Sequence, residues 1–146
     1  LGAEKKTLSE KLQQRISDYT RQGGNLMLSG SYLGSILPAN LAQNTLKFTH
    51  GGSMYGITTG QVFGANTTLS FPTQVNEKSY AVPAPDCLLP TAGAYSTFVY
   101  TPGNYGAGIA YKGTDFRTFV LGFPFESIDN AQHRSRIMKA ALDLFK

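Results

Sequence analysis

The sequence is poor in the residues from which many functional sites are built. It has one cysteine, two histidines and no tryptophan among 146 residues. A single cysteine excludes an internal disulfide and a cysteine metal cluster. The histidines, His50 and His133, are far apart with no cysteine or aspartate at ligand spacing. We therefore expect no metal site and no cofactor.

Charge is also scarce, at 15% of residues, and the net charge is only +4. The basic residues fall mainly on two predicted helices, which is typical of solvated helix faces and argues against a nucleic-acid partner. No apolar run approaches the roughly twenty residues of a membrane-spanning helix. The chain begins at Leu1 without a methionine, so we expect it to be part of a longer protein, with upstream domains as partners.

The length suits a single domain, residues 1–146, with three parts. In the first part, 1–43, an amphipathic helix is predicted over 7–22, with a capping-box pattern at Thr7 and Glu10. The glycines at 23 and 24 end it, and a buried strand over 25–29 runs into a turn or second helix. The apolar face of the first helix consists of Leu8, Leu12, Ile16 and Tyr19.

The middle part, 44–118, is β-rich and interrupted by glycine and proline. Short strands are predicted over 61–63, 68–71, 80–82 and 97–100, and a hairpin turn over 113–115 joins 109–112 to 116–121. The last part, 119–146, is a strand followed by a helix that Ser127 or Asp129 caps. The predicted buried face of that helix consists of Ile137, Met138, Ala141, Leu142 and Phe145.

Two corners, each a strand that runs into a sharp turn, are the most informative features. The first reads Gly30-Ser31-Tyr32-Leu33-Gly34, and the second reads Phe123-Pro124-Phe125-Glu126. Together they resemble the two catalytic corners of class I glutamine amidotransferase-like domains. That family carries a nucleophilic cysteine between two glycines at the first corner and His-x-Glu at the second.

The resemblance implies an α/β, partial three-layer flavodoxin-like domain with a β-rich middle segment, whose catalytic residues have been lost. Tyr32 stands at the cysteine position, and Pro124 at the position of the histidine base, while Glu126 matches the glutamate. The amino-acid sequence around both corners is also similar to the C-terminal region of multidomain Bacteroidetes proteins that carry the label xanthan lyase. This likeness implies a secreted or cell-surface protein that acts on polysaccharide or cell wall.

Other residues offer less. Cys87 lies among apolar neighbours and is interpreted as an inert core thiol. His50 is interpreted as a surface or backbone-bonding residue in a loop, and His133 as part of a solvated helix face. Tyrosines cluster near predicted loops and strand ends, where they cover sheet edges or stack on sugars. The six are Tyr32, Tyr55, Tyr95, Tyr100, Tyr105 and Tyr111, and Tyr55, Tyr95 and Tyr105 are the candidate sugar contacts.

The sequence therefore predicts a non-catalytic accessory or interaction domain. The alternatives are part of a carbohydrate-active enzyme, either a lyase or a hydrolase, and a sugar-binding module. The predicted strand over 25–29 has few preceding residues to supply neighbours, so we also expect an exposed strand edge. Such an edge is open to pairing with another copy of the chain.

Overall fold

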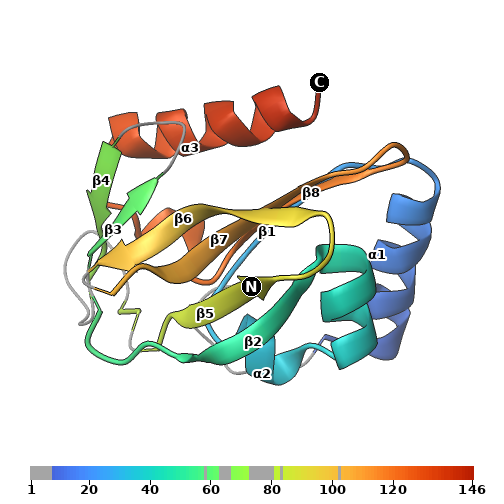
Figure 1. The fold of residues 1–146 in the computed structure, drawn as a ribbon, viewed down its shortest axis with the longest axis horizontal. Coiled ribbons are helices and arrows are strands. Elements are labelled where there is room, and N and C mark those ends of the chain that lie inside the picture. The colour runs from blue at the N-terminus through green and yellow to red at the C-terminus, as the bar shows by residue number, and fades with distance from the viewer. Residues whose placement is uncertain (1–7, 58, 63–66, 73–80, 83, 102) are drawn as a thin grey trace.

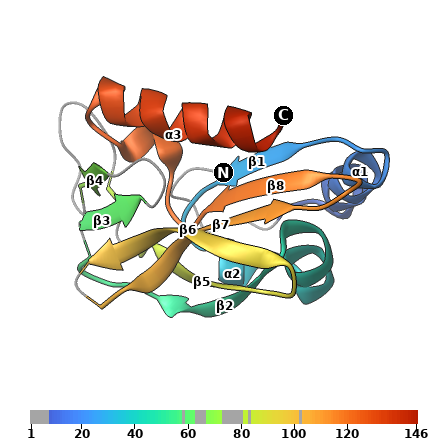
Figure 2. The same ribbon diagram turned by 45° about the horizontal axis from the view of Figure 1, so that its top comes forward.

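The computed structural model describes residues 8–57, 59–62, 67–72, 81–82, 84–101 and 103–146. It is a mixed α/β structure, which confirms the predicted class. The described strands form a six-stranded sheet in the order β1-β8-β7-β6-β3-β4 and a two-stranded sheet of β2 and β5. Helix α3 covers one face of the large sheet, and α2 lies with the small sheet on the other face (Figures 1 and 2).

The first helix, α1 (Glu10–Arg21), begins at Ser9, whose side chain accepts a hydrogen bond from the Leu12 N–H. Thr7 of the predicted capping box lies outside the described residues. The helix ends as predicted, with Gly23 at a φ of 89°. The predicted apolar face is only half right: Leu12 and Tyr19 are exposed, while Leu8 and Ile16 join the core, because α1 packs at one end of the sheet.

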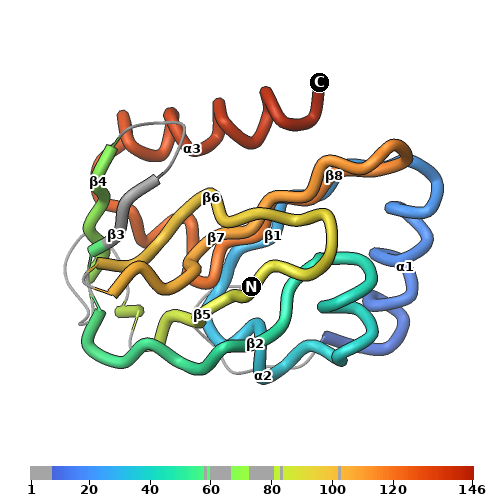
Figure 3. Tube along the Cα trace, viewed as in Figure 1, coloured from blue at the N-terminus to red at the C-terminus, as the bar shows by residue number. Residues whose placement is uncertain are grey.

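The chain then enters β1 (Leu26–Ser29), which lies parallel to β8 (Arg117–Leu121). Figure 3 traces this path from α1 to the edge of the sheet. After β1 come α2 (Leu33–Ile36) and a helix with π-type bonding, η1 (Leu41–Leu46).

The remaining pairings of the large sheet are antiparallel. Short turns join β6 (Ala94–Thr101), β7 (Tyr105–Lys112) and β8, and such turns permit only antiparallel neighbours. The predicted hairpin is confirmed, with Lys112 opposite Arg117. Strands β3 (Thr59–Val62) and β4 (Thr67–Ser70) complete the sheet.

Two strands were not predicted: β2 (Phe48–Ser53) and β5 (Asp86–Pro90). Conversely, Ala81 and Val82 are not in a strand, and Tyr80 lies outside the described residues. Neighbouring residues of β8 point to opposite layers: Phe119 and Leu121 pack in the cluster that contains α3, and Val120 packs in the cluster that contains α2. This alternation explains the continuous apolar run of that segment.

The C-terminal helix α3 (Ala131–Leu144) follows a short 3-10 helix, η2 (Phe125–Ser127). Its cap is Asn130, which accepts from the N–H groups of Gln132 and His133, so the prediction of Ser127 or Asp129 is wrong. An asparagine side chain at the residue directly before the helix has the reach for both N–H groups. Of the predicted buried face, Met138 and Leu142 are exposed.

Candidate functional site

The first corner is a strained elbow. Tyr32, between β1 and α2, has φ 62° and ψ 12°. These angles lie in the left-handed region, which residues other than glycine rarely adopt. This conformation costs about 1 kcal/mol or more and is often found at functional sites. Its neighbours Ser31 and Leu33 are fully buried, so the chain on either side of Tyr32 is fixed by packing.

Gly34 is required by a close approach. A Cβ at this position would lie 2.2 Å from Cδ2 of His50, far inside van der Waals contact. The glycine spacing that marked the elbow in the sequence therefore has a local cause, because the imidazole ring of His50 lies directly against the start of α2.

The carboxylate of Asp86 is the centre of the site. It is fully buried, and its Oδ2 accepts the N–H of Gly34 at 2.9 Å. Its Oδ1 lies 3.3 Å from Nε2 of His50 and accepts the hydroxyl of Ser53 at 3.4 Å. Burial raises the pKa of Asp86 above its ordinary value, against the opposing effects of the Gly34 N–H and of His50.

The main chain of Asp86 joins the two sheets. Its carbonyl accepts the hydroxyl of the fully buried Tyr100 at 3.0 Å, and its N–H donates to the carbonyl of Gly122 at 2.7 Å. Burial raises the pKa of Tyr100 well above its ordinary value, so that hydroxyl stays protonated as a donor. One residue of β5 thus connects the elbow, the small sheet and the large sheet.

A histidine oriented by a buried carboxylate is the arrangement of a general base and the residue that positions it. Here the His50 side chain is 29% exposed while that of Asp86 has no exposure. Among the residues that the structure describes, however, no hydroxyl or thiol hydrogen-bonds to the His50 ring. In this part of the chain, no nucleophile is therefore bonded to the pair to complete a catalytic triad.

The neighbouring nucleophile candidates are engaged or buried. The Ser35 hydroxyl donates to the carbonyl of Tyr32, and Ser31 is enclosed. Cys87 is a buried free thiol, as the sequence predicts. Burial raises the pKa of this thiol above its ordinary value. A thiol of this kind is not activated for attack.

The structure brings the two corners together. The N–H of Phe125 donates to the Ser29 hydroxyl at 3.3 Å, and the N–H of Gly30 donates to the carbonyl of Leu121. Strand β8 ends at Leu121, three residues before Pro124, and the Ser127 hydroxyl donates to the Pro124 carbonyl at 2.6 Å. Glu126 is exposed in η2, and its correspondence to the glutamate of the glutamine amidotransferase-like family stays a prediction.

Sequence reasoning missed both members of the His50–Asp86 pair. The sequence places His50 in a loop, whereas it lies in β2, and no pattern singles out Asp86, which lies in β5. One signal was present: an acidic residue within the apolar, proline-flanked run Val82–Leu89 is typical of a buried and paired carboxylate.

The three candidate sugar contacts are all exposed: Tyr55 at 75%, Tyr95 at 49% and Tyr105 at 48%. Tyr105 opens β7 opposite Tyr100, whereas Tyr95 lies near the other end of β6. The structure therefore does not gather all three at one point. Tyr100 itself is a core residue, contrary to its placement among loop and strand-end tyrosines.

Two further findings bear on function. Within the described residues, no group of three His, Cys, Asp or Glu side chains is positioned to hold a metal ion. None of the described helices combines the length and the apolar character needed to cross a bilayer.

No protein-family model and no curated protein matches the sequence. Solved structures do match the fold. A β-galactosidase from the Antarctic haloarchaeon Halorubrum lacusprofundi aligns over 94% of this chain and 20% of its own, with 17% identity and a TM-score of 0.63. The exo-β-1,4-mannosidase Op5Man5 from Opitutaceae bacterium strain TAV5 aligns over 95% and 23%, with 8% identity and a TM-score of 0.61.

The mmIFT52 N-terminal domain aligns over 98% of this chain and 74% of its own, with 12% identity and a TM-score of 0.61. At these identities the likeness concerns the fold alone. The chain spans about a fifth of the β-galactosidase that it matches. The fold is thus present as a minor part of glycoside hydrolase chains.

Proposed function

We propose that this chain is a non-catalytic accessory or interaction domain, glutamine amidotransferase-like and flavodoxin-like in architecture, within a larger protein that acts on polysaccharide or cell wall. The observation that carries the proposal is the strained elbow at Tyr32, which lies between two glycines in the spacing in which that family carries its nucleophilic cysteine. A phenol with a reference pKa near 10 is a poor acyl acceptor.

The second corner supports the same conclusion. Pro124 replaces the histidine base, and its ring has no proton to exchange. Acyl transfer needs a nucleophile, a base and donors for the oxyanion together, so donors from the elbow backbone alone do not provide turnover. The likeness to segments of β-galactosidases and a mannosidase favours a carbohydrate-active parent, which we place at the cell surface or outside the cell.

The test is a turnover assay of the purified chain with glutamine, aryl esters and acidic polysaccharides. We expect no product above the rate without protein. Turnover that is lost in Tyr32→Phe would overturn the proposal and make Tyr32 a catalytic group.

The alternative is a lyase or hydrolase, and the His50–Asp86 pair is the observation in its favour. A partly exposed histidine held by a buried carboxylate, against the elbow, has the form of a working base. In this alternative His50→Ala abolishes turnover of an acidic polysaccharide, while His133→Ala, on the solvated helix face, leaves it unchanged.

A sugar-binding module is the third possibility, and it rests on the exposed rings of Tyr55, Tyr95 and Tyr105. Affinity electrophoresis in gels that contain polysaccharide distinguishes it. Slower migration in the polysaccharide gel, with a smaller effect in each Tyr→Ala variant, would support sugar binding. Migration equal to that in a gel without polysaccharide would exclude binding of the polysaccharide used.

A further inference from the structure

Strand β1 lies at the edge of the large sheet, paired within the described residues with β8 alone. The N–H of Gly30 donates toward β8, to the carbonyl of Leu121. Backbone groups alternate along a strand, so those of Leu28 and Leu26 also face β8, and the N–H and C=O of Met27 face the opposite side. An edge of this kind accepts a further strand.

The sequence of β1 suits an interior position better than an edge. Leu26, Met27 and Leu28 form an apolar run, typical of a strand covered on both sides, yet all are only half-buried. Neither a charge nor a proline, the residues that commonly protect an edge strand from pairing, occurs within β1.

Helix α3 carries an independent apolar stripe. Only Ile137 and Ala141 of this helix are buried, and Met138 and Leu142 are 36% and 53% exposed. A shallow depression on α3 is lined by Lys139, Asp143 and Lys146 and by the stripe, which consists of the small Ser135 and the apolar Met138, Leu142 and Phe145. Their spacing of three, four and three residues is the spacing with which one helix packs along another.

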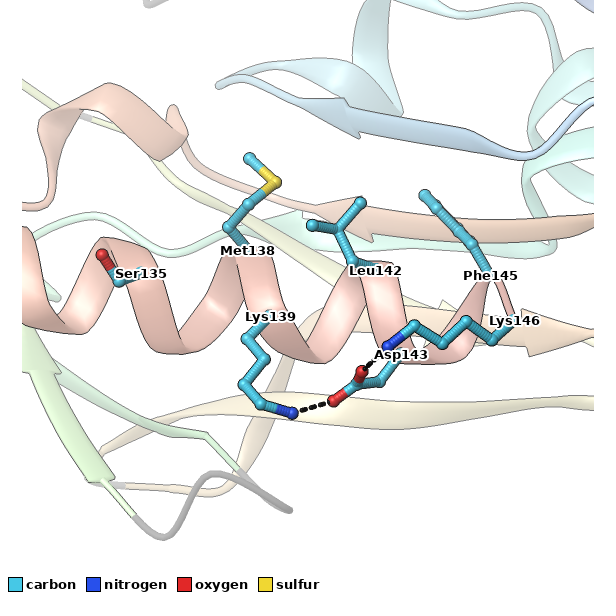
Figure 4. A pocket seen from close by; sticks show the side chains of 7 residues that line it. All are labelled: Ser135, Met138, Lys139, Leu142, Asp143, Phe145 and Lys146. Atoms are coloured by element: carbon cyan, nitrogen blue, oxygen red, sulfur yellow. Dashed lines mark hydrogen bonds and ion pairs between the residues drawn. The ribbon is translucent and has the colours of Figure 1, made fainter.

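Figure 4 shows Met138, Leu142 and Phe145 directed to one side of α3, away from the ion pair of Lys139 with Asp143. The edge of β1 is joined to this stripe. The side-chain N–H of Asn25 donates to the carbonyl of Phe145 at 3.2 Å, and Met27 packs in the same cluster as Phe145. The strand edge and the helix stripe therefore form one continuous surface.

We propose that this surface binds a second copy of the chain about a two-fold axis. Antiparallel pairing of β1 with its copy continues the sheet and places both α3 helices on one face. The C-terminal turn of each α3 then lies near the junction, because Phe145 contacts Asn25 beside β1, and the stripes of the two copies are brought toward each other. The inference rests on this edge and is independent of the proposed function of the elbow.

The stripe is complementary to itself. In an antiparallel arrangement, Met138 lies opposite Leu142 of the copy, and the small Ser135 opposite the large Phe145. Charges of both signs flank the stripe, because Lys139 and Lys146 both contact Asp143. When two such stripes meet about a two-fold axis, side chains of like charge are therefore not lined up against each other.

Sedimentation velocity over a dilution series tests the proposal. We expect the mass of two chains at high concentration and of one chain on dilution. Leu142→Glu places a charge in the stripe and is expected to raise the dimer dissociation constant about tenfold or more. Leu12→Glu is the matched control, since Leu12 is similarly exposed on α1, and it is expected to dimerise like the native chain.

A second variant addresses the strand edge. Met27→Pro removes the outward N–H without removing a bond to β8, and is also expected to weaken the dimer. Circular dichroism verifies that each variant is folded, and the conclusion rests on Leu142→Glu if Met27→Pro is not. The mass of a single chain at every concentration overturns the proposal. The edge of β1 would then pair with a strand from elsewhere in the parent protein. An equal loss in Leu12→Glu, or none in Leu142→Glu, overturns it as well.

Discussion

The Nε2 atom of His50 lies 3.3 Å from Oδ1 of Asp86, across the pairing of β2 with β5. The other oxygen of Asp86 holds the N–H of Gly34 in the elbow. The same carboxylate therefore anchors a partly exposed histidine and the start of α2, which gives it a structural role that can be measured apart from any catalytic one.

Asp86→Ala is expected to lower the free energy of unfolding by about 1–3 kcal/mol. The change leaves the Gly34 N–H without its acceptor inside the protein, and an unpaired buried donor carries a cost of this order. Chemical denaturation measures it. Asp115→Ala, which removes an exposed carboxylate that accepts a hydrogen bond from the neighbouring Thr114, is the control and is expected to change stability little.

The stability is also expected to depend on pH through Asp86. Its folded pKa is raised above the ordinary value of an aspartate, mainly by burial, so the native state holds this proton more tightly than the unfolded state. The proton on Asp86 therefore contributes to the free energy of unfolding. This contribution is fully present below the unfolded pKa and is lost as pH rises through the folded pKa.

The free energy of unfolding of the native chain, minus that of Asp86→Asn, should therefore fall as pH increases from about 4. Denaturant titrations at a series of pH values give this difference directly. A difference that stays constant or rises with pH would show that the effects of Gly34 and His50, which lower the pKa of Asp86, are larger than the effect of burial, which raises it.

Gly34→Ala is expected to destabilise the fold by about 1–3 kcal/mol, the usual cost of overpacking. The added methyl group would overlap the His50 ring and force it away from Asp86. Thermal unfolding checks this, with the neighbouring Ser35→Ala as a control that adds no atoms. Equal melting temperatures for Gly34→Ala and the native chain would contradict the close approach of the ring.

Local signals predicted those parts of the fold that depend on few residues. The turn over 113–115 and the end of α1 at Gly23 are examples, because glycine and turn residues act within their own segment. Leu12 and Tyr19 show the limit: helical spacing identifies an apolar face, but which part of it is covered depends on how α1 packs on the sheet.

The candidate site could be predicted only in part. The elbow is visible in the spacing of Gly30 and Gly34, but the His50–Asp86 pair is created by β2 and β5, which are distant in sequence. The glycines at 51 and 52 and the prolines around Asp86 have low strand propensity, so neither strand is apparent until the large sheet provides its partners.

The central claim is that the elbow supplies no nucleophile, and covalent labelling tests it most directly. The purified chain is incubated with an electrophilic glutamine analogue, such as a chloroketone, and labelled peptides are located by mass spectrometry. Tyr32→Cys is the positive control, because it places a thiol at the strained position. The account predicts label at position 32 in Tyr32→Cys and none within residues 29–35 of the native chain. Labelling of Tyr32, Ser31 or Ser35 in the native chain, lost in His50→Ala, would contradict it.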